Sequence, residues 1–191
     1  MNKRAKLNSI RIISGSWRGR RLPVLDSDGL RPTTDRVRET LFNWLMHDVN
    51  GANCLDLFAG SGALGLECLS RGAEFVQFVE ANAKVAASLS ANLNTLLSDK
   101  ARADVSQQDA LNFLKSNQGK RYDVVFLDPP FQSELAVQAI KLLLDNNWLG
   151  EKALVYLEQD SNLDVINVPE QWQVYRQGSA GQSRYTVYIC E

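Results

Sequence analysis

Apolar residues along the chain fall into short continuous runs separated by segments in which they recur at helical spacing. A short apolar run bounded by turn residues is typical of a buried strand, whereas a spacing of three and four residues is typical of an amphipathic helix. The runs predict strands over residues 54–59, 75–80, 103–107, 122–127, 153–158, 172–177 and 184–190. Helices are expected from 32–35 to about 46, from the turn at 60–65 to Gly72, and over about 81–98, 109–114 and 134–146.

The alternation of strand and helix predicts an α/β fold built on one open, mostly parallel, seven-stranded sheet with helices on its faces. The last two strands follow each other without a helix, across Gly178-Ser179-Ala180-Gly181. We therefore expect them to form a C-terminal antiparallel hairpin whose turn lies at those four residues.

A small β-hairpin is expected before the main domain, because β-like runs at 10–13 and 21–24 flank a glycine-punctuated turn. This turn carries Trp17, Arg18, Arg20 and Arg21. Guanidinium groups beside an exposed aromatic ring suit phosphate contact and base stacking, as in the binding of looped RNA. The alternative is that Trp17 anchors the hairpin to the core.

Charge is distributed unevenly along the chain. Residues 1–50 hold 10 Lys or Arg against 5 Asp or Glu, whereas residues 51–191 hold 11 Lys or Arg against 17 Asp or Glu. This asymmetry suggests a basic arm for a polyanion, although an ordinary solvated tail gives the same balance. We divide the chain into a basic arm with its hairpin (1–30) and a main domain that includes its N-terminal helix (31–191).

The 191 residues are 45% hydrophobic, enough for a full core, and no apolar run reaches the length of a membrane helix. Met1 to Lys6 are basic without a following signal-peptide core. Cys54, Cys68 and Cys190 have no metal-ligand spacing and are expected to be reduced core residues. These features favour a cytoplasmic protein that binds neither a membrane nor a metal.

The first ligand-binding signal is the turn Gly60-x-Gly62-x-x-Gly65 between a strand and a helix. Such a turn lets a ligand approach the backbone closely and offers free amides at the helix N-terminus. Asp56, four residues before the first glycine, would repel a pyrophosphate but suits a ligand with an ammonium and a sulfonium. Glu80, at the tip of the next strand, is placed to accept ribose hydroxyls.

Two further positions have both a structural and a ligand-binding interpretation. Asp109 could cap the helix that follows it or accept from an adenine amino group, and both can hold together. Arg31-Pro32-Thr33-Thr34 could line a ligand pocket, but a capped first helix explains this segment equally well.

The run Tyr122 to Phe131 (YDVVFLDPPF) is the second ligand-binding signal, because a strand buried on both faces ends in a rigid acidic loop. Its two prolines hold the chain extended and leave the loop carbonyls facing outward. At the carboxyl end of a central strand such a loop suits a flat, amino-bearing group. A plain Pro-Pro turn, with Asp128 as a cap, is the alternative.

Four stretches together resemble the bacterial RsmD family of 16S rRNA (guanine(966)-N(2))-methyltransferases: SGSWRGRRLPV, GLRPTTDRVRETLFNWL, LDLFAGSGALGLECLSRGA and VFLDPPF. The resemblance implies a class I methyltransferase (Rossmann-like) fold and S-adenosyl-L-methionine as the cofactor. It places the methionine part on Asp56, Phe58, Ala59, Gly60 and Gly62, the ribose on Glu80, and the adenine on Asp109 and Ala110.

By the same resemblance, the catalytic loop is Asp128, Pro129, Pro130 and Phe131. Asp128 and the Pro129 carbonyl would accept from the guanine N2 amino group, and Phe131 would stack on the base. Thr33 and Thr34 join the cofactor site, and the RNA contacts are Trp17, Arg18, Arg20, Arg21 and Arg31. The partner is 16S rRNA in the small ribosomal subunit, bound by a monomer.

Three rival interpretations remain open. A nucleotide-binding oxidoreductase could use the same glycine turn, but it leaves Asp56 and the Asp128 loop unexplained. An amino methyltransferase acting on DNA adenine or on a protein side chain would share that loop. A non-catalytic RNA-binding relative is the third, although its pocket would not need these acids and glycines.

Overall fold

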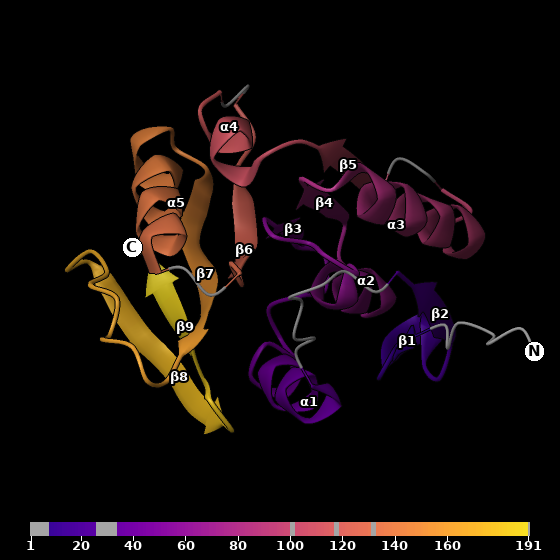
Figure 1. Ribbon diagram of the computed structural model, residues 1–191, viewed down its shortest axis with the longest axis horizontal. Helices are drawn as coiled ribbons and strands as arrows, with labels where there is room; N and C mark the ends of the chain where they lie inside the picture. Colours follow the sequence, from indigo (N-terminus) through magenta and orange to yellow (C-terminus); the bar gives the residue numbers. More distant parts are fainter. Residues whose placement is uncertain (1–7, 26–33, 100–101, 117–118, 131–132, 191) are drawn as a thin grey trace, which may run out of the picture.

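A seven-stranded sheet forms the centre of the computed structural model, which describes residues 8–25, 34–99, 102–116, 119–130 and 133–190 (Figure 1). The strand order is β5-β4-β3-β6-β7-β9-β8, and only the pairings of β9 are antiparallel. The strands are β3 (Asn53–Asp56), β4 (Phe75–Glu80), β5 (Ala103–Gln107), β6 (Tyr122–Leu127), β7 (Leu149–Asp160), β8 (Trp172–Ala180) and β9 (Ser183–Cys190). The predicted mostly parallel sheet with its C-terminal hairpin is confirmed.

Helices cover both faces of this sheet. They are α1 (Asp35–Trp44), α2 (Ala63–Ser70), α3 (Ala83–Leu96), α4 (Ala110–Leu114) and α5 (Ser133–Asp145). Buried residues of α1, α2 and α3 form one hydrophobic cluster with one face of the sheet, and those of α4 and α5 form a second cluster with the other face. The core is therefore divided into two layers by a sheet that is buried on both sides, as parallel sheets require.

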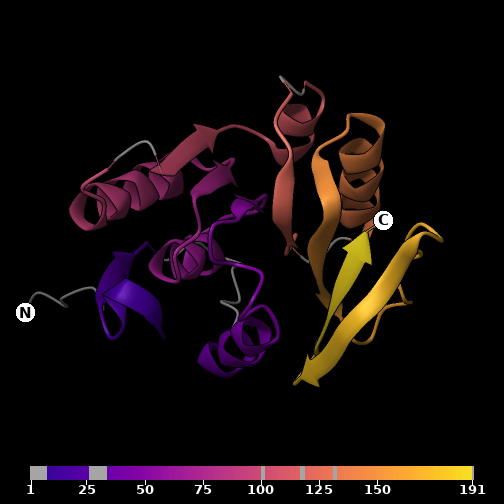
Figure 2. The same ribbon diagram turned by 180° about the vertical axis from the view of Figure 1, so that it is seen from behind.

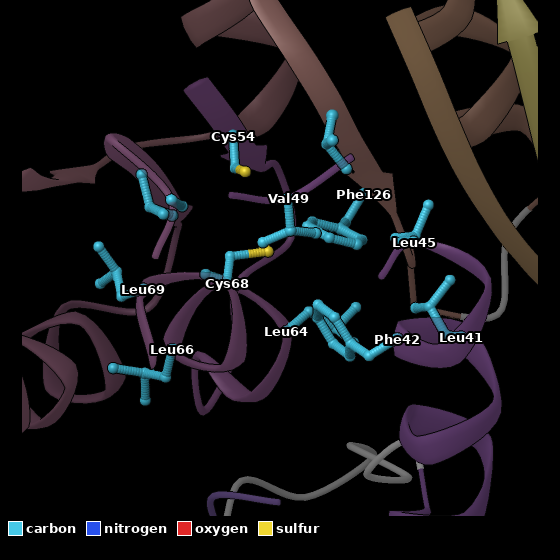
Figure 3. Close-up of a cluster of buried hydrophobic side chains, with 14 of the residues drawn as sticks. Leu41, Phe42, Leu45, Val49, Cys54, Leu64, Leu66, Cys68, Leu69 and Phe126 are labelled. Carbon is cyan, nitrogen blue, oxygen red and sulfur yellow. The ribbon is translucent and has the colours of Figure 1, made fainter. Parts of the chain in front are cut away.

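The centre of the first cluster lies between α1, α2 and the central strands (Figure 3). Phe42 of α1 meets Phe126 of β6 with their ring centroids 6.1 Å apart, and Cys54 and Cys68 are buried beside them. Together with Cys190, these cysteines are free and buried. The cysteines thus serve as core residues, as the sequence predicts.

The strand order reverses between β3 and β6, because β4 and β5 lie on one side of β3 whereas β6 and β7 lie on the other. In an open α/β sheet the loops that leave the carboxyl ends of such strands diverge and leave a crevice for a ligand. Asp56, Glu80 and Asp128 lie at or just beyond the carboxyl ends of β3, β4 and β6. The topology therefore brings together acids that are far apart in the sequence.

The expected N-terminal hairpin is present as β1 (Asn8–Arg11) and β2 (Arg21–Val24), joined through a 3-10 turn at Gly15–Trp17. It lies beside α2, on the opposite side of α1 from the β8–β9 hairpin (Figures 1 and 2). Ile10, Ile12 and Leu22 join the same hydrophobic cluster as α1 and α2. No observation tests the division of the chain after residue 30, which stays a prediction.

Polar contacts fix the hairpin on the end of α2. The fully buried carboxylate of Glu67 accepts from the amides of Ile13 and Ser14, both at 2.9 Å. The hydroxyl of Ser70 donates to the Ser14 carbonyl at 2.5 Å and accepts from the Trp17 amide at 3.0 Å. The hairpin is therefore held rigidly against the body of the protein.

The expectation that Trp17 is exposed is wrong, because only 8% of the residue is accessible and it belongs to the main core. Its ring is packed in the core, so it is unavailable to stack on a base. The alternative role as an anchor fits this position. Arg18, Arg20 and Arg21 are exposed around it, as the RNA-binding interpretation needs.

Gly15 and Gly19 offer a matched test of this docking, since both have a left-handed φ, +80° and +82°. A Cβ at Gly15 would lie 1.9 Å from the Ser70 carbonyl oxygen, whereas one at Gly19 would meet nothing within 4 Å. We expect Gly15→Ala to lower the free energy of unfolding by roughly 2 kcal/mol more than Gly19→Ala, because the backbone strain is shared and only the clash differs. Urea denaturation of both variants measures this difference, and equal losses would contradict the docking.

Several boundaries differ from the sequence-based prediction; the strand expected over 54–59, for example, is β3 and ends at Asp56. β7 begins at Leu149 rather than at 153, and a register shift in its pairing with β6 falls between Tyr122 and Val124. The last hairpin turns at 181–182, so the predicted turn at Gly178 is wrong. Gly178 lies within β8, where a Cβ would lie 2.7 Å from the ring of Tyr185, so glycine is needed at this position for packing rather than for a turn. No helix in the described part of the chain is long and apolar enough to cross a membrane.

Candidate active site

A pocket of about 340 Å³ opens at the carboxyl ends of β3, β4 and β6. Its walls combine apolar residues with the acids that the sequence singles out. The lining residues are Leu57, Phe58, Gly60, Val79, Glu80, Ala81, Asn82, Val85, Gln108, Asp109, Ala110, Asp128, Pro130 and Leu135. A concave, mostly apolar pocket with a few convergent polar groups is typical of a small-molecule site.

Glu80 lies at the tip of β4 and organises one wall of this pocket. One carboxylate oxygen accepts from the Gly60 amide at 2.8 Å, and the other accepts from the Asn82 amide at 2.7 Å. Each oxygen of an ionised carboxylate offers two acceptor positions, so these backbone contacts leave capacity for two hydroxyl groups. Glu80 is thus both a brace for the glycine turn and a fixed acceptor in the pocket.

Asp109 combines the two roles that the sequence left open. Its carboxylate accepts from the Asn112 amide at 2.9 Å and so caps α4. It also lines the pocket together with Ala110, the first residue of that helix. The cap fixes the position of the Asp109 carboxylate at the pocket.

The glycines of the turn have different roles. Gly60 lines the pocket, as predicted, but Gly62 does not. A Cβ at Gly62 would lie 2.4 Å from Leu89 of α3, and one at Gly65 would lie 2.2 Å from the ring of Phe78. Packing against α3 thus accounts for glycine at position 62, and the contact of Gly62 with a ligand stays a prediction. Ala59 also lies outside the pocket, and its amide donates to the Val79 carbonyl.

Asp56 is buried beneath the turn, with 3% of the residue accessible, and is not a lining residue of the pocket. Its carboxylate accepts from the Gly65 amide at 3.0 Å. Burial raises the pKa of Asp56 to about 7; the hydrogen bond from Gly65 lowers the pKa, and the charge of Glu80 raises it. Asp56 thus supports the glycine turn through the Gly65 amide. Because its pKa is about 7, a nearby cation would shift the carboxyl group to its ionised form.

The raised pKa of Asp56 makes folding stability depend on pH. Its folded-state pKa of about 7 lies above the ordinary value of 3.8, so the folded protein binds this proton more tightly than the unfolded chain. The contribution of this proton to the free energy of unfolding is complete below pH 4. It is lost, by about 1.4 kcal/mol per pH unit, as the pH rises to about 7. We expect the stability of Asp56→Asn relative to the parent protein to be greater at pH 8 than at pH 5, because the parent protein loses most of this contribution between the two pH values.

Denaturation by urea at pH 5 and at pH 8 measures this difference. Asp48→Asn, which alters an exposed carboxylate, is the control and should show the same change at both pH values. A difference between Asp56→Asn and the parent protein that does not vary with pH would refute the assignment.

The loop after β6 forms the opposite wall, where Asp128 and Pro130 line the pocket and Pro129 is half-buried between them. Tyr156 of β7 lies near this loop. Burial is the main cause that raises the pKa of Tyr156 well above its usual range, and the charges of Glu158 and Asp128 raise it further. The loop therefore presents an acid at the boundary between the pocket and β7.

Thr34 does not line the pocket; its hydroxyl accepts from the Val37 amide at 3.3 Å and caps α1, the alternative that the sequence offered. Arg31, Thr33 and Phe131 lie outside the described residues, and their roles stay predictions.

Sequence reasoning missed several lining residues. Ala81, Asn82 and Gln108 adjoin the predicted acids, so their position at strand ends could have indicated them. Val85 and Leu135 lie on helices and carry no such signal.

Comparison with known proteins identifies the family. The family model described as "Conserved hypothetical protein 95" matches residues 10–189. The ribosomal RNA small subunit methyltransferase D of Haemophilus influenzae is 52% identical over 94% of this chain and 93% of its own length. Its namesake from Escherichia coli K12 is 50% identical over 94% of this chain and 89% of its own length. The chain belongs to the RsmD family.

Solved structures agree with this placement in the RsmD family. The Escherichia coli protein yhhF matches with a TM-score of 0.89 and 47% identity over 96% of this chain and 99% of its own. A magnesium protoporphyrin IX methyltransferase from Synechocystis, solved with bound S-adenosylmethionine, shares the fold at a TM-score of 0.61 and 19% identity, over 82% of this chain and 79% of its own. Within the described residues, no group of three or more His, Cys, Asp or Glu side chains is arranged to hold a metal ion.

Proposed function

We propose that this protein transfers a methyl group from S-adenosyl-L-methionine to the N2 amino group of guanine 966 in 16S rRNA. The observation that carries the proposal is the position of Asp128 in a rigid Asp-Pro-Pro loop on the wall of a pocket that also holds Glu80 and Asp109. Membership of the RsmD family and the names of its rRNA methyltransferase relatives support the substrate class.

The pocket fits the adenosine part of this cofactor. Glu80 would accept from the ribose hydroxyls, and Asp109 would accept from the adenine amino group beside Ala110. The turn at Phe58 and Gly60 would hold the methionine part, with the Asp56 carboxylate beneath it offering a counter-charge. When bound, the cofactor supplies a methyl group on a positively charged sulfur.

Asp128 supplies what the acceptor amine needs. The lone pair of a guanine exocyclic amine is delocalised into the ring, so the free amine is a weak nucleophile. Two fixed acceptors, the Asp128 carboxylate and the Pro129 carbonyl, would hold its two protons and turn the lone pair towards the methyl group. The acid also stabilises the positive charge that develops on the nitrogen. Phe131 would stack on the base.

The target base must leave its stack to reach this loop, as in other enzymes that modify bases. We propose that the docked hairpin holds the surrounding rRNA through the exposed Arg18, Arg20 and Arg21, with Arg31 as a further contact. A monomer acting on an assembling small subunit fits so short a basic surface, because the particle can supply the remaining contacts. No metal is proposed in the reaction.

Removing charge from the hairpin tests the RNA contact. We expect the double variant Arg18→Ala/Arg20→Ala to bind small subunits about tenfold more weakly and to lower the slope of log affinity against log salt by about 1 to 2, because two phosphate contacts are lost. Filter binding across a series of KCl concentrations measures both quantities. Arg176→Ala is the control, since Arg176 is exposed on the distant β8–β9 hairpin. Unchanged binding of the double variant would rule out the hairpin as an RNA contact.

The reaction itself is tested by incubating the protein with labelled S-adenosylmethionine and three acceptors: small subunits from cells lacking this gene, naked 16S rRNA, and DNA. We expect label in 16S rRNA, released on digestion as N2-methylguanosine. Label only in DNA or in ribosomal proteins would contradict the proposed substrate, and binding of the cofactor without transfer would favour a non-catalytic relative.

A further inference from the structure

Three side chains form a row across the carboxyl end of the sheet, on the face that α1 covers. They are Asp128, which follows β6, Glu158 near the end of β7, and Ser183 at the start of β9. The register pairs Leu127 with Leu157 and Asp160 with Ser183, so the three strand ends adjoin one another. Only Asp128 of this row belongs to the cofactor pocket.

The alternation of the strands places Asp128 and Glu158 on the same face. Phe126 and Tyr156 are paired and lie in the cluster under α1, whereas Leu127 and Leu157 lie in the opposite cluster. Glu158, two residues beyond Tyr156 in the same strand, returns to the α1 face. Asp128 precedes a proline, which restricts it to an extended conformation and so continues the alternation.

Two hydroxyl groups fix the carboxylate of Glu158. Tyr156 donates to one oxygen at 2.6 Å, and Ser183 donates to the other at 2.5 Å. Tyr156 is almost fully buried, and its pKa is raised by burial and by neighbouring carboxylates, so its hydroxyl keeps the proton it donates. Glu158 is half-buried and is therefore a pre-oriented acceptor at the molecular surface.

The position of this carboxylate relative to the cofactor pocket indicates what it faces. The pocket is lined by the end of β4, by the loops that follow β3, β4, β5 and β6, and by Val85 of α3, Ala110 of α4 and Leu135 of α5. Among the described residues, none of the lining comes from β7 or β9. A base whose amino group is held at Asp128 can extend away from the cofactor, across the end of β6 and towards β7. Two acids of β7, Glu158 and Asp160, lie on this side. Glu158 is the neighbour of Asp128, because it follows Leu157, the register partner of Leu127.

We propose that Glu158 is a specificity-determining residue that accepts a hydrogen bond from N1–H of the target guanine. This inference rests on the proposed function, because it assumes that a guanine amino group is held at Asp128. N1–H and the N2 amino group are neighbouring donors on one edge of guanine, so adjacent acids at Asp128 and Glu158 match adjacent donors. Enzymes that take a base out of its stack commonly identify it through this edge.

An adenine in the same position would present a lone pair at N1 instead of a hydrogen. The Glu158 carboxylate would then face an acceptor, and its own desolvation would be uncompensated. A site built to pair with a substrate N–H rejects an analogue that lacks it far more strongly than an apolar site does. Glu158 would thus exclude adenine, which the Asp-Pro-Pro loop alone does not distinguish from guanine.

The test uses small subunits reconstituted with 16S rRNA that carries either guanosine or 2,6-diaminopurine riboside at the target position. The analogue keeps the N2 amino group but has a lone pair at N1. We expect the parent protein to prefer guanosine by at least about tenfold in kcat/KM. In Glu158→Gln, whose amide can donate to that lone pair, the preference should fall to near equality. A smaller fall is expected in Ser183→Ala, which removes one of the hydroxyls that hold Glu158.

Glu151→Gln is the matched control, because it makes the same change in an exposed residue at the other end of β7 and should keep the preference of the parent protein. Thermal melting shows whether each variant is folded, and Ser183→Ala keeps the inference testable if Glu158→Gln is not. An unchanged preference in folded Glu158→Gln, or equal use of both substrates by the parent protein, would overturn the role of Glu158. Failure of the parent protein to form N2-methylguanosine would instead overturn the proposed function.

Discussion

Asp128→Asn should reduce methyl transfer to small subunits by about 10³-fold while leaving affinity for S-adenosylmethionine within about threefold. The substitution keeps the shape of the side chain but removes the charge that stabilises the developing cation, and its amide can offer a donor where the amine needs an acceptor. Because Asp128 lies on the loop after β6, whereas Glu80 and Asp109 lie at or just after the ends of β4 and β5, cofactor binding should depend on it little. Single-turnover transfer and calorimetric titration measure the two effects separately.

Asp123→Asn is the matched control for this experiment. Asp123 lies on the same strand, is exposed at its amino end, and accepts from the Asn53 amide at 2.8 Å. Its substitution should leave transfer unchanged. If Asp128→Asn instead lost cofactor affinity in proportion to its rate, Asp128 would belong to the cofactor site rather than to the acceptor site.

Glu80→Gln should weaken binding of S-adenosylmethionine and of S-adenosylhomocysteine by about 100-fold each, equivalent to about 2.7 kcal/mol. The parent carboxylate accepts from the amides of Gly60 and Asn82 through different oxygens. Glutamine has a single oxygen, so one of these amides would lose its acceptor and the glycine turn would loosen. The charge-assisted hydrogen bonds to the ribose would be lost as well.

Isothermal titration of both ligands measures this loss, and the two should fall equally because the ribose is common to them. Glu74→Gln, an exposed position immediately before β4, serves as the control and should bind as the parent protein does. A selective loss for S-adenosylmethionine alone would place Glu80 near the sulfur rather than at the ribose.

Much of the fold could be predicted from the periodicity of apolar residues. The bounds expected for the strands at 75–80 and 103–107 match β4 and β5, because these strands are bounded by clear turn residues. The early start of β7 was not predictable, since Leu149–Lys152 contain a glycine and two charged residues, and of these four only Leu149 pairs with β6, before an irregularity between Tyr122 and Val124. The role of Gly178 depends on Tyr185, a cross-strand neighbour that local sequence does not reveal.

The acids of the site could be predicted because each lies at or just after the carboxyl end of a strand, and parallel topology brings such ends together. How deeply the residues lie beneath the pocket surface could not be predicted. Asp56 lies below the turn and Gly62 packs against α3, and both facts depend on helices placed by tertiary contacts. Trp17 was misplaced for the same reason, as the docking that buries it depends on Glu67 and Ser70, which lie 50 and 53 residues further along the chain.

Mass spectrometry of 16S rRNA from cells lacking this gene tests the central claim most directly. The nuclease fragment that contains guanine 966 is compared after expression of the parent protein and of Asp128→Asn. The account predicts that the parent protein makes this fragment heavier by one methyl group, located on N2, and that Asp128→Asn leaves it unmodified. A fragment that stays unmodified with the parent protein, or that carries its methyl group on another atom, would contradict it.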